Sequence, residues 1–171
     1  MQLLMVLPRI ALSRDAERRL RRATVQLEVD PKHCVFRSVS RLARRVTTLF
    51  DAELQAAGIT AGHFTILMTL FRAGPSSIGK LADLLDMDAT TVPRVLQPLI
   101  RSGCAGVATG PDRRYRIVSI STKGCARLDA ALPHWERLQK RVEAELQPTA
   151  WAALRIALSA LRRSATQMQH S

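Results

Sequence analysis

The chain has 171 residues, of which 26 are lysine or arginine and 14 are aspartate or glutamate, so its formal net charge is +12. This length predicts one domain with a tail, and a hydrophobic content of 47% is enough to build a packed core. The excess of basic residues favours a polyanionic partner, with nucleic acid ahead of an anionic membrane surface.

Cysteine and histidine usage argues against a metal centre and against a disulfide framework. The three cysteines and four histidines are scattered, without the spacing of a zinc site. No catalytic motif or phosphate-binding glycine loop occurs, so we expect no enzyme activity and no cofactor. The apolar stretch at 3–12 is too short for a bilayer span and lacks the features of a signal peptide, so we expect a cytoplasmic protein.

Residues 1–32 form a basic appendage in this interpretation. Asp30 and Pro31 close this appendage. Its short helical stretch is crowded with arginines: Arg14, Arg18, Arg19, Arg21 and Arg22. A poorly ordered, solvated arm is favoured, because so polar a segment gains little by docking. The alternative is an arm that contacts DNA phosphates.

Two amphipathic helices are predicted after the arm. Apolar residues recur at helical spacing from Val35 to Leu54, and Gly58 follows where a helix C-cap belongs. Thr60 is a suitable N-cap for a second helix, which Gly74 and Pro75 end. We interpret His63, in the first turn of that helix, as a partly buried packing residue rather than a ligand.

A helix, a tight turn and a second helix follow. Ser76 or Ser77 caps the first, and Asp88 caps the second, which Gly103 ends. The buried stripe of the second helix is predicted to be Val92, Val95, Leu96, Leu99 and Ile100. Ala89, Thr90, Arg94 and Gln97 are left on the outer side, with Thr91 near the boundary; such side chains read base edges and hold phosphates.

The next segment predicts a β-hairpin with a basic tip. Strands at 104–109 and 115–121 flank a turn that carries Asp112, Arg113 and Arg114. Ser121 or Thr122 then caps a long helix, which Gln147-Pro148-Thr149 separates from a last amphipathic helix. A helix for the major groove and an arginine loop for the minor groove indicate a winged helix-turn-helix that binds duplex DNA.

Four segments in this order resemble the MarR family of bacterial transcriptional regulators. They are CVFRSVSRLARRVTTLFDAELQAAGIT, SIGKLADLLDMDATTVPRVLQPLIRSG, GPDRRYRIVSISTKG, and ALPHWERLQ with the helix after it. The resemblance covers roughly residues 34–163. It implies a mainly α (α+β) fold, a winged helix-turn-helix with long N- and C-terminal dimerisation helices.

The resemblance also implies an organisation and a set of contacts. A winged helix domain spans 33–168, with the DNA-binding lobe at 76–122 and dimerisation helices at 34–57 and 123–165. The first helix of the motif is 77–85 and the recognition helix is 88–102. The candidate DNA-binding residues are Ser77, Ala89, Thr90, Thr91, Arg94, Gln97, Asp112, Arg113 and Arg114. Asp112 would pair with Arg114 and shape the loop that enters the minor groove.

Two departures from the family pattern stand out. Pro93 falls inside the expected recognition helix, where it removes a hydrogen bond and crowds the carbonyl of Ala89, and Pro98 follows in the same helix. Cys34 lies two residues before the position, here Phe36, at which some members of the family carry a peroxide-sensing cysteine. We therefore expect Cys34 to be a structural or incidental residue rather than a redox sensor.

The expected function is a sequence-specific regulator of transcription that binds double-stranded DNA. The resemblance implies a homodimer on a pseudo-palindromic operator and a ligand-responsive repressor. Its effector would be a small amphipathic or phenolic molecule, in a pocket between the first two helices and the long fifth helix. The competing hypothesis is a basic helical interaction or membrane-surface protein without DNA sequence specificity. The hairpin argues against it, because a membrane binder needs a continuous basic and apolar helix instead.

Overall fold

The computed structural model describes residues 13–16, 18–19, 22, 34–109 and 116–169. The chain divides into two compact units, Met1–Arg45 and Val46–Ser171, and the boundary falls within helix α2 (Val35–Leu54). The elements after α2 are η1 (Gln55–Ala57), α3 (Ala61–Ala73), β1 (Ser76–Ser77), α4 (Ile78–Leu85), α5 (Val92–Arg101), β2 (Ala105–Thr109), β3 (Arg116–Ile120), α6 (Thr122–Leu146) and α7 (Pro148–Gln169).

The first unit contains the predicted basic arm, most of which lies outside the described residues. Arg14, Arg18, Arg19 and Arg22 are exposed and helical, and the Ala16 N–H donates to the Ser13 hydroxyl at 3.2 Å. Whether the arm is solvated or contacts DNA therefore stays a prediction.

Helix α2 carries an apolar stripe that one chain leaves uncovered. Phe36 is 81% exposed, and other large apolar side chains of the stripe are at least 39% exposed: Val35, Val39, Leu42, Val46 and Leu49. Only Leu54, at the end of the helix, is buried. The predicted helical spacing is confirmed, but the side of the helix that it marks is free in a single chain.

The predicted caps define the element boundaries in the second unit. Gly58 has φ of 68° and ends η1, and the Thr60 side chain accepts a hydrogen bond from the His63 N–H at the start of α3. Ser121 accepts from the Gly124 N–H and begins α6. Gln147, with φ of 59°, separates α6 from α7, and α7 begins at Pro148, where a missing N–H costs nothing.

The core of the second unit lies between α3, α4, α5, the sheet and the first half of α6. Its fully buried large residues are Leu54, Leu67, Leu70, Leu81, Leu96, Leu99, Val92 and Val118. The rings of Phe64 on α3 and Trp135 on α6 stack with centroids 5.7 Å apart, which joins the long helix to this core.

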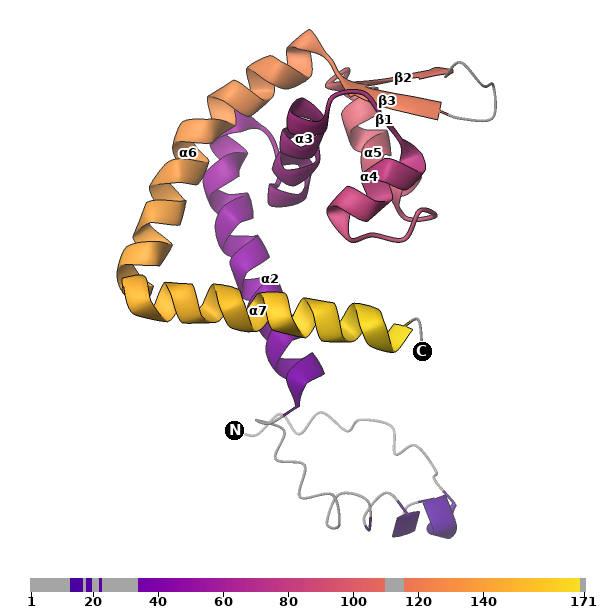
Figure 1. Ribbon diagram of the computed structural model, residues 1–171, viewed down its shortest axis with the longest axis vertical. Helices are drawn as coiled ribbons and strands as arrows, with labels where there is room; N and C mark the ends of the chain where they lie inside the picture. The colour runs from indigo at the N-terminus through magenta and orange to yellow at the C-terminus, as the bar shows by residue number, and fades with distance from the viewer. Residues whose placement is uncertain (1–12, 17, 20–21, 23–33, 110–115, 170–171) are drawn as a thin grey trace, which may run out of the picture. The chain divides into compact units, whose positions relative to one another are not determined.

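The three strands form one antiparallel sheet with the order β1-β3-β2. Ser76 pairs with Val118 on one side of β3, and Val107 pairs with Val118 on the other. Figure 1 shows α3, α4 and α5 grouped beside this sheet, while the β2–β3 hairpin projects away from them. The hairpin is thus anchored at its base, next to the helix-turn-helix.

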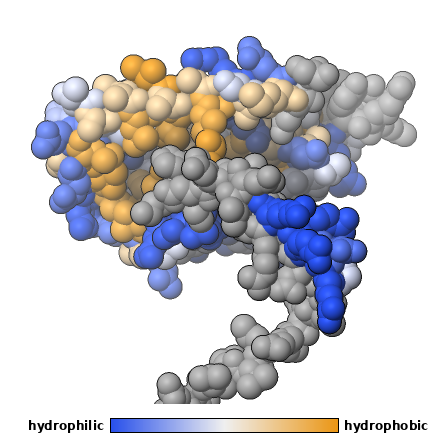
Figure 2. All heavy atoms as spheres, turned by 90° about the horizontal axis from the view of Figure 1, so that it is seen from below, coloured by the Kyte–Doolittle hydropathy of each residue, from blue (hydrophilic) through white to orange (hydrophobic). Residues whose placement is uncertain are grey.

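Helix α7 contributes little to this core. It packs mainly against α6, and its residues from Arg155 to Met168 are exposed, including Ile156, which is 70% exposed. Figure 2 views the molecule from below Figure 1 and shows hydrophobic residues gathered over part of that face. A long helix in water usually needs a packed apolar side, so α7 indicates a missing partner surface.

Candidate nucleic-acid interface

Helix α4 is the first helix of the predicted motif, and its bounds agree with the prediction. Ser77 caps it by accepting a hydrogen bond from the Lys80 N–H at 3.2 Å. Leu81 and Ala82 are buried against the core, while Ile78 and Leu85 are partly buried beside them. Ser77 is one of the candidate DNA-binding residues. It is half-buried, and its hydroxyl already has a partner within the protein, the Lys80 N–H.

Helix α5, the predicted recognition helix, begins at Val92, so the predicted start at Asp88 is wrong. The cause is Pro93, which has no N–H to donate and therefore occupies the second position of the helix, where no intrahelical partner is needed. The expected crowding of the Ala89 carbonyl inside a helix does not arise, because Ala89 belongs to the preceding turn. Pro98 is accommodated inside α5.

Asp88 orders the turn before α5. Its Oδ1 accepts from the Thr90 N–H at 2.7 Å and from the Thr90 hydroxyl at 2.5 Å. These two hydrogen bonds lower the pKa of the Asp88 carboxyl below its ordinary value, and the bond from the hydroxyl has the larger effect. The Asp88 carbonyl also accepts from the N–H groups of Thr91 and Val92. Thr90 is thereby held in an exposed turn and not on the helix where it was predicted.

The two sides of the recognition element are those predicted. Val92, Leu96 and Leu99 are buried in the core, with Val95 and Ile100 partly buried beside them. Ala89, Thr90, Arg94 and Gln97 are exposed, and Thr91 is intermediate. Arg94 and Gln97 therefore extend into solvent from the side of α5 opposite the core, where base edges could reach them.

The β2–β3 hairpin is regular up to the pair Thr109 and Arg116. Both of these residues are exposed, so the hairpin leaves the core before its tip. Asp112, Arg113 and Arg114 lie outside the described residues, and their predicted role stays a prediction.

A tight joint fixes the hairpin to the end of α5 and to the start of α6. The Ser121 hydroxyl donates to the Gly103 carbonyl at 2.6 Å and accepts from the Gly124 N–H at 3.0 Å. A Cβ at Gly124 would clash with the carbonyl oxygen of Cys104. Helix α5, the β2–β3 hairpin and the long helix α6 therefore meet at one rigid point.

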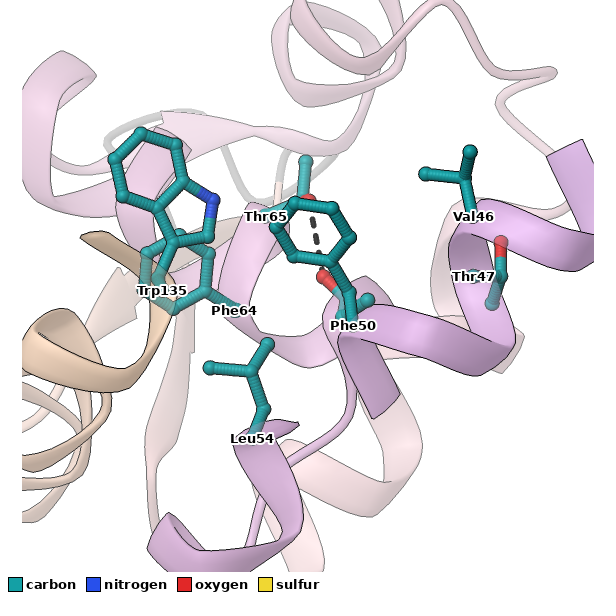
Figure 3. A pocket seen from close by; sticks show the side chains of 8 residues that line it. Val46, Thr47, Phe50, Leu54, Phe64, Thr65 and Trp135 are labelled. Atoms are coloured by element: carbon teal, nitrogen blue, oxygen red, sulfur yellow. Dashed lines mark hydrogen bonds between the residues drawn. The ribbon is translucent and has the colours of Figure 1, made fainter. Parts of the chain in front are cut away.

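The second unit also contains a small cavity. Its volume is about 220 Å³, and α2, α3 and α6 supply its lining: Val46, Thr47, Phe50, Leu54, Ala61, Phe64, Thr65 and Trp135. Figure 3 shows the aromatic rings and Leu54 around it, with the Thr65 hydroxyl donating to the Ala61 carbonyl at 3.0 Å. No charged side chain belongs to the described lining.

His63 and Asp51 lie near the start of α3, next to this cavity. The Asp51 carboxylate accepts from the Ala61 N–H at 2.7 Å and so caps the helix. Burial lowers the pKa of the half-buried His63 imidazole below its ordinary value, although the Asp51 charge opposes this shift. The predicted partial burial of His63 is confirmed.

Within the described ranges, no three His, Cys, Asp or Glu side chains group in a way that could hold a metal ion. Over the same residues, no single helix is long and apolar enough to cross a membrane. By length and composition one bent pair passes that test, Val35–Ala57 with Ala61–Ala73.

Solved structures with the same fold are regulators of transcription. The M. tuberculosis regulator MosR in complex with DNA is 27% identical, with a TM-score of 0.74 over 80% of this chain and 98% of that chain. A mutant of E. coli MarR complexed with operator DNA is 22% identical, with a TM-score of 0.70 over 78% and 95% of the two chains. No protein-family model and no curated protein sequence matches the chain.

The B. bronchiseptica protein BpsR, studied for regulation of its DNA binding by 6-hydroxynicotinic acid, is 24% identical. Its TM-score is 0.65, over 78% of this chain and 94% of that chain. These likenesses support the resemblance to the MarR family that the sequence predicts. The expected winged helix-turn-helix fold, mainly helical with a small antiparallel sheet, is confirmed. The proteins compared are regulators rather than enzymes.

Some features of this chain were not predicted. The two-residue strand β1 escapes detection because it is too short for any periodicity, although Ser76 is buried in it. The joint at Gly124 had a usable signal: a glycine in the first turn of a helix is costly unless another backbone approaches closely. Cys34 is half-buried just before α2, and its expected structural role stays a prediction.

Proposed function

We propose that this protein is a sequence-specific regulator of transcription that binds double-stranded DNA. The single observation that carries the proposal is the two-sided recognition element, with Val92, Leu96 and Leu99 buried and Arg94 and Gln97 exposed. The anchored hairpin beside it supports a second contact in the adjacent minor groove, made by Arg113 and Arg114 near its tip. The net charge of +12 favours the phosphate backbone as a partner.

The proposed active form is a homodimer on a pseudo-palindromic operator. The exposed apolar stripe of α2 and the exposed side of α7 support this proposal, because large uncovered apolar surfaces mark interfaces. A second copy of the chain would supply the same surfaces, as a two-fold symmetric dimer requires. The helices proposed for dimerisation are therefore 34–57 and 123–165.

The proposed effector is a small amphipathic or phenolic molecule that releases a repressor from its operator. The cavity beside α3 supports it with three aromatic rings, Phe50, Phe64 and Trp135, and two hydroxyls, Thr47 and Thr65. Because the lining lacks a cation, an uncharged ring fits it better than a carboxylate. A ligand in this cavity would contact Phe64, which belongs to the core of the second unit, and Trp135 on α6, the helix that leads to α7.

Selection of duplexes from a randomised library by the wild-type protein tests DNA recognition. We expect enrichment of a pseudo-palindromic motif, and competition by heparin that does not abolish the preference. Equal retention of all sequences, together with tight binding to anionic phospholipid vesicles, would contradict the proposal and favour the membrane-surface hypothesis.

Titration with phenol and with benzoate tests the effector site. We expect phenol to change the fluorescence of Trp135 and to weaken binding to the enriched duplex, while benzoate does so less. Trp135→Phe identifies the source of the signal, because Trp151 remains. Equal responses to both compounds, or none, would contradict an uncharged aromatic effector in this cavity.

A further inference from the structure

One ion pair connects α7 to the helix-turn-helix. The Nη1 atom of Arg162 lies 3.0 Å from Oδ1 and 3.0 Å from Oδ2 of Asp86. Both side chains are more than half exposed, at 64% and 57%. Since α7 otherwise packs mainly against α6, this pair is a polar bridge between the last helix and the helix-turn-helix.

Asp86 holds a special place in the motif. It ends α4 in the left-handed conformation, with φ of 51°, and its N–H donates to the Ala82 and Asp83 carbonyls. Glycine would adopt this conformation at lower cost, but it lacks the carboxylate that reaches Arg162. The residue that forms the turn between α4 and α5 is therefore also the residue that α7 contacts.

The exposure of the pair argues for a role in geometry rather than in stability. Ion pairs in solvent contribute little to folding free energy. A charge–charge contact at the turn between α4 and α5 can nevertheless restrict how the helix-turn-helix is oriented relative to α7. One nitrogen contacts both oxygens, so a lysine could reproduce the contact without the planar guanidinium.

We propose that Arg162 is a positioning residue that holds the helix-turn-helix at a set orientation to α7. The inference rests on the proposed function, in which α7 takes part in the dimer and α5 contacts DNA. In such a dimer, two Arg162–Asp86 pairs set the separation of the two recognition helices. They thereby select the spacing between operator half-sites.

Spacing discrimination by designed variants tests this role. The probes are the duplex that the wild-type protein enriches from a random library, the same duplex with one central base pair inserted, and one with a changed base in a half-site. The variants are Arg162→Gln, Asp86→Asn and Arg162→Lys. Arg72→Gln serves as the control, because it removes an equal charge from an exposed site at the end of α3, outside the proposed DNA and dimer contacts.

We expect Arg162→Gln and Asp86→Asn to reduce the preference for the original spacing by roughly three- to tenfold, because two exposed pairs are lost per dimer. The preference for the unchanged half-site base should persist, since α5 itself is intact. Arg162→Lys and Arg72→Gln should retain the wild-type spacing preference. Thermal melting of each dimer, which we expect to change little, separates a positioning effect from unfolding.

Unchanged spacing preference in Arg162→Gln would overturn the inference. Equal losses in the lysine and glutamine variants of Arg162 would also overturn it, because they would indicate packing rather than charge. An equal loss in Arg72→Gln would do the same. Failure of the proposed function is recognised separately, because the wild-type protein would then enrich no duplex or would sediment as a monomer. That result would remove the basis of this inference as well.

Discussion

Single side chains on the outer side of α5 carry the specificity in this account. Arg94 is exposed while Val95 and Leu96, which follow it, turn toward the core. A guanidinium in this place can bind a guanine edge with two hydrogen bonds or a phosphate with its charge. These two roles differ in what they do to binding of random DNA.

Arg94→Ala should flatten the difference between the enriched duplex and random DNA by about 1–3 kcal/mol if Arg94 reads a base. If Arg94 holds only a phosphate, both affinities should fall together, and the salt slope should fall by about 1 per subunit. We favour base contact. Fluorescence anisotropy at two salt concentrations distinguishes the two roles, with Arg72→Ala on α3 as the charge-matched control. A variant with unchanged affinity and discrimination would exclude both roles.

His63 makes the stability of the fold depend on pH in a definite direction. Burial lowers the pKa of His63 in the folded protein, so the unfolded chain binds the proton more readily. The free energy of unfolding should therefore decrease as pH falls below about 6.5, the ordinary value for histidine. Urea unfolding at pH 7.5 and pH 5.5 measures this, and His63→Gln should reduce the difference. An equal difference in both proteins would show that other groups cause it.

Elements in this chain were predictable wherever a local cap or a sustained period specifies them. Thr60, Ser77 and Ser121 each accept the expected N-terminal hydrogen bond, and the buried stripe of α5 follows its spacing. The start of α5 was misplaced because Pro93 overrides a good N-cap at Asp88. The long-range contact of Arg162 with Asp86 could not be predicted, since no spacing encodes it. Gly124 signals a close backbone approach, but not that the approaching backbone is that of Cys104.

The hairpin is the second DNA-contacting element in this account. We expect Arg114→Ala to weaken binding to the enriched duplex by roughly 1–3 kcal/mol, because it removes a minor-groove charge. Dimer melting temperature should change little, since the strands are anchored by the pairing of β3 with both neighbours. Competition binding at physiological salt measures the loss. Wild-type affinity in Arg114→Ala would rule out the wing contact.

At the scale of the whole molecule, the exposed apolar sides of α2 and α7 support the proposed homodimer. We expect a stable homodimer that buries more than about 2,000 Å². Leu158→Glu on α7 should weaken it by more than about 2 kcal/mol, because an unpaired charge would enter an apolar interface. Sedimentation velocity at sub-micromolar concentration measures the dimer. Phe71→Glu is the matched control, because it makes the same kind of change at an exposed apolar residue of α3, outside the helices proposed for dimerisation. A compact wild-type monomer would contradict the dimer.

Hydroxyl-radical footprinting of the wild-type protein on the enriched duplex tests the central claim most directly. Two winged lobes in a symmetric dimer predict two protected regions related by a two-fold axis, with centres about 10 base pairs or a multiple apart. Each region should include minor-groove protection beside the recognised half-site, where the hairpin binds. A single protected region, uniform protection along the duplex, or no protection would contradict the account.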